Sequence, residues 1–332
     1  MGKPVRMADI AERLGISVVS VSKALAGKSG VSEEMRARVV ALARELGYEG
    51  ARAPAAAGTG NLGVLVADRF FDENTFYTSL YRSVVLACGA EGLTCMIEIV
   101  SREAERSASL PALVTGRKVD GVVFLGNLDR NYLRAVSAGG LPCLLLDFYI
   151  PGGVVDCVVS DNLDGGCALT EHLLAQGRRE IGFVGSIRAT SSIMDRYLGY
   201  QRALRFAGLT PREDWLLEDR DEEGGFIPLK LPEELPQAFL CSCDEVAYNL
   251  VETLRQMGKR VPEDVAVCGY DDFRFATLCQ PPLTSYRVNV EQMAETAVRR
   301  LASRLRLEEA EPLTVKVAGR MVVRESSGGA RE

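Results

Sequence analysis

The sequence predicts an α/β protein made of a small helical head and a larger core of two doubly wound parallel sheets. Three observations lead to this prediction. The chain of 332 residues is too long for one domain of about 150 residues. Residues 1–48 carry only helical patterns, whereas short apolar runs alternate with amphipathic stretches from residue 62 onward. Residues 49–60, rich in Ala, Gly and Pro, read as a linker between the two parts.

Two short helices and a longer one are expected in the head. Ile10 and Leu14 lie one helical turn apart, and Val21 and Leu25 repeat this spacing after a tight turn at Gly15. A longer apolar stripe then follows an acidic first turn. A helix, a tight turn, a second helix and a third helix together make a minimal DNA-binding head.

Eight β-branched or apolar runs beyond the linker predict strands, in two successive series. They are residues 62–67, 94–100, 121–125, 143–146, 154–160, 181–184, 238–241 and 265–268. Amphipathic helices such as 169–176 and 246–257 separate them, which is typical of parallel sheets covered on both faces. In such sheets ligands bind beyond the carboxyl ends of the strands, so functional side chains are expected in those loops.

The composition excludes several classes of protein. Hydrophobic residues make up 47% and charged residues 25%, as in ordinary globular chains. No run approaches the ~18 apolar residues of a membrane helix, and the start of the chain lacks a secretory pattern. A cytoplasmic protein without a membrane partner is therefore expected.

The cysteine and histidine counts argue against a metal, a cofactor and an enzyme. Nine cysteines, scattered through apolar runs, read as reduced small hydrophobic residues. His172 is the only histidine, so no tetrahedral zinc set is available, and it reads as a helix-surface residue. No Ser-His-Asp arrangement, Walker loop or dinucleotide fingerprint is visible in the sequence.

Charge is distributed unevenly along the chain. The formal net charge is −6. Residues 1–60 hold nine Lys or Arg against six Asp or Glu, whereas the remainder holds thirty against thirty-nine. A basic head on an acidic body fits a head that binds a polyanion.

The residues from Val5 to Leu25, VRMADIAERLGISVVSVSKAL, closely resemble the N-terminus of the LacI/GalR (lac-repressor) family of bacterial transcription regulators. Further motifs resemble that family in the same order. They are Val31-Ser32 and residues 74–77, 119–121, 160–162, 177–181, 196–200, 261–265, 269–272 and 281–284. The resemblance implies a homodimer that binds a pseudo-palindromic DNA operator, and a core like the periplasmic sugar-binding proteins.

The resemblance also implies a division of the core. The chain is expected to cross between two lobes near Ser160, Tyr286 and Leu313. The first lobe would be 61–160 plus 287–313 and the second 161–286 plus 314–328, with a small-molecule effector between them.

The resemblance assigns DNA contacts to the second helix. Val18, Val19 and Lys23 match base-reading positions, where Lys23 can donate to guanine and the valines can touch a thymine methyl. The expected phosphate contacts are Arg6, Ser17, Ser20 and Ser22. Two alternatives remain open: that the serines serve only as helix caps, and that the valines pack in the core of the head.

The linker departs from the family pattern. In the family this segment forms a hinge helix on DNA, with a leucine wedged into the minor groove. Here Ala57 matches the leucine and Pro54 lies within the segment. We expect weaker bending of the operator, or reading of its centre through Arg52.

The resemblance places a sugar-like effector among polar and aromatic side chains. The expected contacts are Phe76, Tyr77, Asp161, Ser192, Arg196, Asp221 and Asp271. Three aspartates against one arginine favour a neutral or cationic effector. Thr190 stands where purine-binding relatives have an arginine. Alternatives are a surface ion pair for Arg196 and Asp271, and helix or dimer packing for the aromatic pair.

Three prolines in residues 227–236 make a helix there implausible. The edge of the effector cleft that this segment forms is therefore expected to differ from that of the family. Three other functions remain open: a regulator that has lost sugar binding and responds to a protein partner, a solute-binding protein, and an enzyme. The sequence leaves open the operator, the effector, the direction of its effect, and a dimer or a tetramer.

Overall fold

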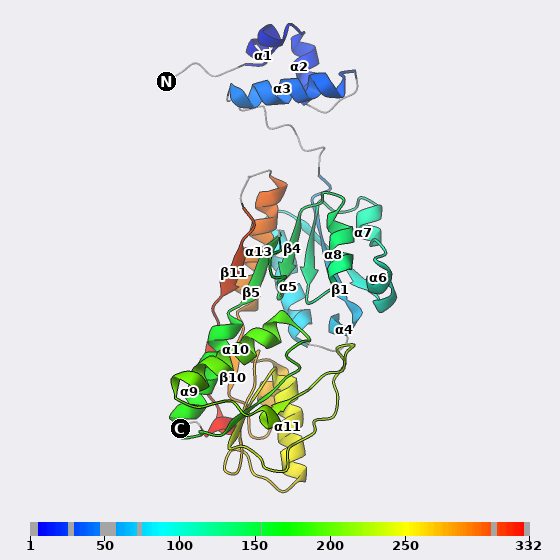
Figure 1. The fold of residues 1–332 in the computed structure, drawn as a ribbon. Helices are drawn as coiled ribbons and strands as arrows, with labels where there is room; N and C mark the ends of the chain where they lie inside the picture. Colours follow the sequence, from blue (N-terminus) through cyan, green and yellow to red (C-terminus); the bar gives the residue numbers. More distant parts are fainter. Residues whose placement is uncertain are drawn as a thin grey trace. The chain divides into compact units, whose positions relative to one another are not determined.

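A computed structural model of the chain describes residues 6–25, 30–46, 58–71, 75–153, 155–306 and 311–328. The chain forms two compact units, Met1–Thr59 and Gly60–Glu332 (Figure 1). The first is all helical and the second is an α/β core, as the sequence predicts. No described helix is both long and apolar enough to cross a bilayer.

The head consists of α1 (Met7–Leu14), α2 (Val18–Leu25) and α3 (Glu33–Glu45). Their apolar faces meet in one cluster around Ile10, Val21 and Val39, all fully buried. Gly15 has a φ of 66°, so the tight turn between α1 and α2 uses the left-handed region that glycine adopts easily. The three predicted helices are therefore confirmed.

The first lobe contains a six-stranded parallel sheet in the order β11-β5-β4-β3-β1-β2. Its strands are β1 (Asn61–Ala67), β2 (Thr94–Val100), β3 (Gly121–Leu125), β4 (Cys143–Leu146), β5 (Asp156–Ser160) and β11 (Thr314–Val317). All of β3 and β4 is buried, because helices cover both faces of the sheet. Those helices are α4 (Asp68–Phe71), α5 (Thr75–Ala90), α6 (Arg102–Ser107), α7 (Ala112–Thr115), α8 (Arg130–Ser137) and α13 (Val290–Leu305).

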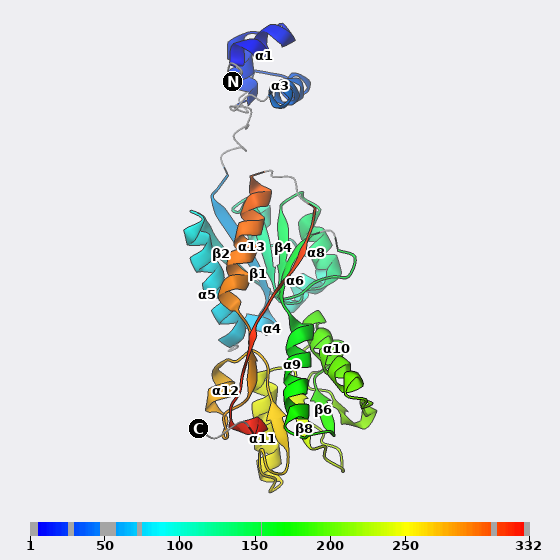
Figure 2. The same ribbon diagram turned by 90° about the vertical axis from the view of Figure 1, so that its left-hand side faces the viewer.

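The second lobe contains a four-stranded parallel sheet in the order β7-β6-β8-β9. Figure 2 labels two of its strands, β6 and β8. Its strands are β6 (Ile181–Val184), β7 (Leu216–Leu217), β8 (Ala238–Cys241) and β9 (Ala266–Cys268). Its helices are α9 (Asn162–Ala175), α10 (Ser191–Phe206), α11 (Asp244–Gln256) and α12 (Arg274–Leu278). The fully described segment 227–236 forms no helix, as its prolines predict.

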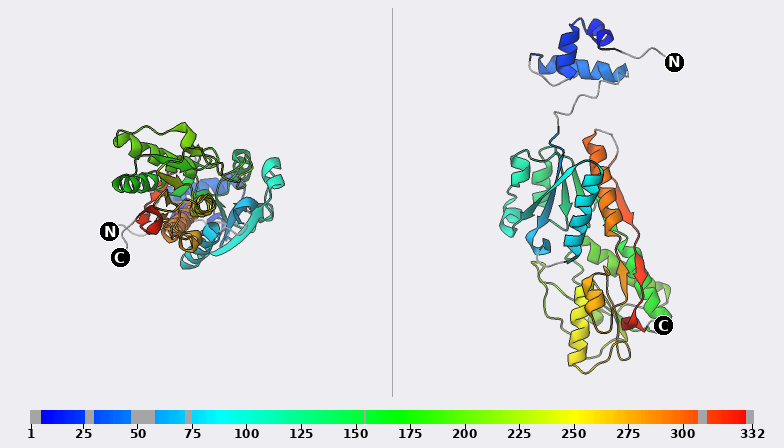
Figure 3. Two further views of the ribbon diagram at one scale, coloured as in Figure 1. Left: turned by 90° about the horizontal axis from the view of Figure 1, so that it is seen from below. Right: turned by 180° about the vertical axis from the view of Figure 1, so that it is seen from behind.

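The chain crosses between the lobes three times along one flank of the core (Figure 3). The first crossing follows β5, and the second follows β10 (Ser285–Arg287), which pairs antiparallel with β12 (Arg320–Val322). The third differs from the prediction at Leu313, because β11 pairs with β5 in the first lobe.

Asp156 accounts for the position of the third crossing. Its carboxylate accepts the Leu313 N–H at 2.9 Å and pairs with Arg300 and Arg304 at 3.0 and 2.8 Å. The start of β11 is thereby attached to the first lobe. The chain leaves that lobe only after Val317, so residues 314–317 do not belong to the second lobe.

Candidate functional site: the second helix of the head and a cavity between the core lobes

The exposed face of α2 carries the predicted base-reading residues. Val18 and Val19 are 46% and 64% exposed. Val21 of the same helix faces the hydrophobic cluster of the head and is fully buried. The alternative in which the valine pair packs in the head is therefore wrong. Lys23 lies exposed on the same helix, and DNA contact by these residues remains a prediction.

The serines of the head have different local roles. The Ser17 Oγ accepts the Ser20 N–H at 3.0 Å and lies 2.9 Å from the Ser20 Oγ, so Ser17 caps α2. Ser22 and Arg6 are exposed, and the Arg6 N–H donates to Asp9 at the start of α1. The predicted Arg52 contact and the hinge residues Pro54 and Ala57 lie outside the described residues.

A cavity lies between the two lobes of the core, at the carboxyl ends of their strands. It opens to solvent and is lined by residues of both lobes. Asn127 follows β3, Asp147 follows β4, Ser242 follows β8 and Asp271 lies just beyond β9. The cavity is where the topology of two doubly wound sheets predicts a ligand.

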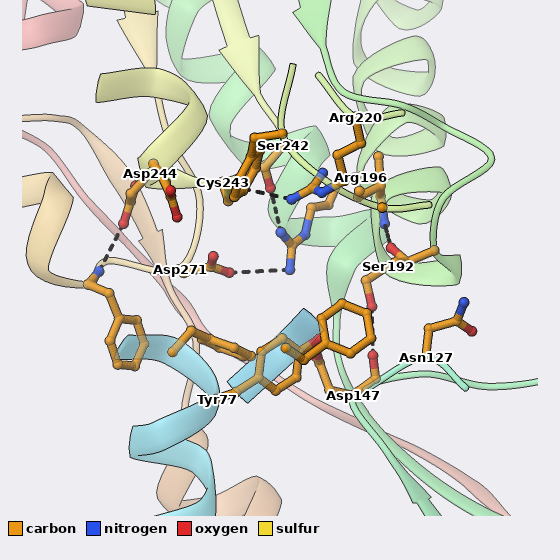
Figure 4. Close-up of a pocket in the computed structure, with 18 of the residues that line it drawn as sticks. Tyr77, Asn127, Asp147, Ser192, Arg196, Arg220, Ser242, Cys243, Asp244 and Asp271 are labelled. Atoms are coloured by element: carbon orange, nitrogen blue, oxygen red, sulfur yellow. Dashed lines mark hydrogen bonds and ion pairs between the residues drawn. The ribbon is translucent and has the colours of Figure 1, made fainter. Parts of the chain in front are cut away.

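Arg196 of α10 is held at the centre of this cavity (Figure 4). It donates from Nε to Asn162 Oδ1 at 2.8 Å and from Nη1 to the Ser242 carbonyl oxygen at 2.5 Å, and its Nη2 lies 3.3 Å from Asp271 Oδ1. The guanidinium stacks over the Tyr270 ring at 3.8 Å. Arg196 is only 5% exposed, so the alternative of a surface ion pair is wrong.

Two carboxyl groups in the cavity have altered acidity. Burial raises the pKa of Asp271 to about 7, although the nearby Arg196 opposes this shift. Burial likewise raises the pKa of Asp147 to about 6, opposed by Arg196 and by the Tyr77 hydroxyl. Both groups therefore titrate close to neutral pH.

Asp147 is a candidate effector contact that the sequence analysis missed. Its Oδ2 accepts the Tyr77 hydroxyl at 2.9 Å, and its backbone oxygen accepts the Ser192 hydroxyl at 2.9 Å. Its Oδ1 is buried and has no hydrogen-bond partner among the described residues. The signal was present, since Asp147 directly follows the apolar run of β4.

Aromatic rings form the side of the cavity that the first lobe contributes. Phe76 and Tyr77, both predicted contacts, lie edge to face with ring centroids 5.1 Å apart. Phe70 approaches Tyr77 at 5.0 Å, and Phe273 of the second lobe approaches Phe76 at 5.3 Å. Phe76 and Tyr77 are thus packed residues that also line the cavity.

Two predicted contacts lie outside this cavity. Asp161 caps α9 by accepting the Asp164 N–H, and its carboxylate lies 3.9 Å from Lys316 Nζ. Asp221 accepts the N–H groups of Glu223 and Gly225 in a turn beside the cavity. Its neighbour Arg220 lines the cavity instead, because Arg220 pairs with Phe226 and leaves Asp221 in the turn.

The charged residues that line the cavity consequently differ from the predicted set of three aspartates and one arginine. Arg69, Arg196 and Arg220 all line it. Each has an acidic partner: Glu105 at 2.5 Å, Asp271 at 3.3 Å and Asp219 at 2.7 Å, respectively. The prediction of three aspartates facing one arginine is wrong, because Asp161 and Asp221 lie elsewhere. The described residues hold no group of three or more His, Cys, Asp or Glu arranged for a metal.

Comparison with known families gives two matches. Residues 6–50 match the bacterial regulatory proteins of the lacI family, and residues 170–327 match the periplasmic binding protein-like domain. The first match covers the helical head. The second covers most of the second lobe and the segments that return through the first.

Individual relatives are similar along almost their whole length. The relative named HTH-type transcriptional repressor PurR, from Glaesserella parasuis serovar 5, is 26% identical over 320 residues, 93% of each chain. The ribose operon repressor of Haemophilus influenzae is 26% identical over 327 residues, 96% of this chain and 98% of the relative. Both are named as repressors rather than enzymes.

Solved structures share the architecture. A complex of the transcriptional regulator CelR with cellobiose has a TM-score of 0.70 and 26% identity, covering 97% of this chain and 99% of the other. The lac repressor dimer bound to operator and the anti-inducer ONPF has a TM-score of 0.67 and 23% identity, covering 98% and 99%. The second likeness concerns the fold alone.

Proposed function

Since this chain belongs to the lacI family of bacterial regulatory proteins, we propose that it is a transcriptional repressor controlled by a sugar-like effector. The head binds an operator in double-stranded DNA through α2, and the effector binds between the two core lobes. Two copies act as a homodimer on a pseudo-palindromic site, in the cytoplasm where a bacterial chromosome lies. The cavity around Arg196 is the observation that supports this proposal most directly.

The cavity suits a sugar because it combines aromatic and polar groups. Phe70, Phe76 and Tyr77 offer aromatic rings to the apolar face of a pyranose or furanose. Beside these rings, Asp147 Oδ1 is a buried acceptor that lacks a partner among the described residues, and a sugar hydroxyl can donate to it. A buried acceptor without a donor is costly, so an effector hydroxyl there contributes to both affinity and selectivity.

A sugar is favoured over a purine for a second reason. By the resemblance, purine-binding relatives have an arginine where this chain has Thr190. The Thr190 hydroxyl caps α10 by accepting the Ile193 N–H at 3.1 Å. This side chain is therefore committed to its own helix. The relative that was solved with cellobiose supports a saccharide as the class of effector.

The effector acts by changing the relation between the lobes. The lobes already touch through Asn127 Nδ2, which donates to the Ala189 carbonyl oxygen at 3.3 Å, and through Tyr149 Oη, which donates to Asp195 at 2.9 Å. An effector that contacts both lobes stabilises one arrangement of them. Linkage then requires that effector and operator alter each other's affinity by the same factor.

A thermal-shift screen of the full chain with mono- and disaccharides, and with purine bases as the competing class, tests the effector. We expect a saccharide to raise the melting temperature, because it binds the folded core. Arg196→Lys should abolish the shift, since one ammonium cannot replace the three directed contacts of the guanidinium. Lys230→Arg, on an exposed loop, is the matched control.

A gel shift on the promoter region of the chain's own gene tests DNA binding, with and without the saccharide from the screen. Binding that responds to the saccharide supports the whole proposal. DNA binding together with a shift only for purines would replace the sugar by a purine. DNA binding with no small-molecule response at all would favour the alternative regulator that responds to a protein partner.

A further inference from the structure

One segment of the second lobe extends across the entrance of the cavity to the first lobe. We call residues 219–227 the cleft hairpin. Arg220 and Phe226 pair in an antiparallel bridge, the Asp221 N–H donates to the Gly225 carbonyl oxygen at 2.9 Å, and the Ile227 N–H donates to that of Asp219 at 3.0 Å.

The base of the cleft hairpin is fixed in the second lobe. Asp219 is 1% exposed, and its carboxylate accepts the Ser186 N–H at 2.7 Å and the Ser242 hydroxyl at 2.6 Å. The Arg220 guanidinium donates to the same carboxylate and lies over the Phe226 ring at 4.7 Å. The base therefore sets the direction in which the cleft hairpin leaves the lobe.

The tip of the cleft hairpin contacts the first lobe through charge. The Glu223 carboxylate pairs with Arg102 Nη1 and with Arg106 Nη2, the latter at 3.4 Å, and both arginines belong to α6. Gly224 lies beside Arg69, since a Cβ at this glycine would be 3.5 Å from the Arg69 Cδ. Arg69 is itself held by Glu105 and by the Asn127 carbonyl oxygen, so the tip meets an ordered surface.

The same hairpin contributes three residues to the cavity wall: Arg220, Gly224 and Phe226. The contact at its tip therefore influences the shape of the cavity. Glu223 itself does not line the cavity but lines a neighbouring groove, together with Arg102 and Arg106. The three charged side chains of the contact are 41% to 73% exposed. Such pairs are individually weak and screened by salt, which suits a contact that must open to admit an effector.

We propose that Glu223 is a positioning residue that holds the cleft hairpin against α6 of the opposite lobe, and so keeps Arg220 and Phe226 in the cavity wall. This inference deepens the proposed function, because it assigns the cavity an electrostatic entrance. The attachment itself does not depend on which effector binds. It can therefore be tested on the protein without any ligand.

Hydrogen–deuterium exchange of the full-length protein, measured by mass spectrometry without effector, tests the attachment. A hairpin this short is not stable alone, so its internal hydrogen bonds should open more often once the tip is released. We expect Glu223→Gln to speed exchange of residues 219–227 by about two- to five-fold at low salt. The Arg102→Gln, Arg106→Gln double variant should give the same increase.

Salt provides the readout that a merely structural role would not change. Exchange of the cleft hairpin in the wild-type protein should rise between low salt and 1 M NaCl, and in Glu223→Gln it should not. Glu252→Gln is the matched control, since it removes a Glu–Arg pair at 2.7 Å that lies within α11. That variant should leave the salt response of the hairpin unchanged.

A charge reversal completes the experiment. Glu223→Arg combined with Arg102→Glu and Arg106→Glu should restore slow exchange, whereas Glu223→Arg alone should not. Equal exchange in wild type and Glu223→Gln, or an equal salt response, would overturn the inference. If no saccharide binds in the thermal-shift screen, the proposed function fails while these exchange results still decide the role of Glu223.

Discussion

At the scale of single residues, the two carboxyl groups that face Arg196 share an unusual backbone conformation. Asp147 has a φ of 71° and Asp271 a φ of 101°, both in the region that non-glycine residues rarely adopt. Such strain persists where the surrounding structure holds it, and it is common at ligand sites. Here it accompanies burial that raises the pKa of both groups, so the cavity is built at a cost in stability.

Asp147→Asn should stabilise the core at pH 8. Burial raises the pKa of Asp147 to about 6, so the folded state binds the proton more tightly than the unfolded state does. Stability therefore falls as the pH rises from about 4, the ordinary aspartate pKa, to about 6, and stays low above that. Asparagine stays neutral and can still accept the Tyr77 hydroxyl, so it avoids this loss.

Thermal unfolding at several pH values measures this effect. The gain in melting temperature of Asp147→Asn over wild type should be largest at pH 8 and should shrink as the pH is lowered below 6. Asp164→Asn, on the exposed surface of α9, is the surface control. A gain that is the same at every pH would show that the charge of Asp147 is not the cause.

Lys23→Ala should weaken operator binding by about 1–3 kcal/mol, which corresponds to roughly five- to 150-fold, and should relax the preference at one base pair. The reason is the loss of a donor on the exposed face of α2. Fluorescence anisotropy with operator and single-base variants measures both changes. Lys230→Ala on the core should have no effect on affinity, and a uniform loss over all sequences would instead assign Lys23 to a phosphate.

At the scale of elements, the packing of α9 against α10 determines where Arg196 lies. A Cβ at Gly199 of α10 would overlap the backbone of α9 at Leu163, and a Cβ at Gly166 of α9 would overlap the backbone of Arg196. The two helices therefore approach at backbone distance, which only glycine allows. This close approach brings the Arg196 side chain to the end of β8, where it meets Ser242.

Gly199→Ala should destabilise the core by about 1–3 kcal/mol, because the added methyl group forces the helices apart. It should also displace Arg196 and weaken effector binding. Urea unfolding measures the first effect and the thermal-shift response measures the second. Gly89→Ala on α5 is the matched control, because nothing lies within 4 Å of a Cβ added there. This variant should leave stability unchanged or raise it by up to about 1 kcal/mol.

At the scale of the whole molecule, head and core have separate hydrophobic clusters. The head cluster contains only residues of the first unit, and the core clusters contain none of them. A unit with its own core can fold by itself. The two functions proposed for this chain should therefore be separable by cutting between the units.

A fragment of residues 60–332 should unfold cooperatively at the melting temperature of the core in the full chain. It should retain the saccharide response and lose operator binding. Calorimetry and the gel shift provide the measurements, with the full chain as the control. A fragment that is unfolded, or that melts far below the full chain, would show that the head stabilises the core.

Much of the fold could be predicted because it follows from short sequence patterns, such as apolar runs and helical periodicity. Continuous apolar runs such as Gly121–Leu125 and Cys143–Leu146 form strands buried on both faces, so their bounds follow from hydrophobicity alone. The turn at Gly15 and the exposed valines of α2 follow from helical periodicity. The importance of Arg196 came from the resemblance to a family, and its burial agrees with that assignment.

From the amino-acid sequence alone, the helical head, eight of the ten described strands of the two parallel sheets, and the class of the core could be predicted. Tertiary structure alone decided which lobe holds β11, which side chain beyond β7 lines the cavity, and that Asp147 is a buried acceptor. The physical reason is distance along the chain. β11 pairs with β5 across more than 150 residues, and a change of one position in the cleft hairpin exchanges Arg220 for Asp221, so no local pattern distinguishes the outcomes.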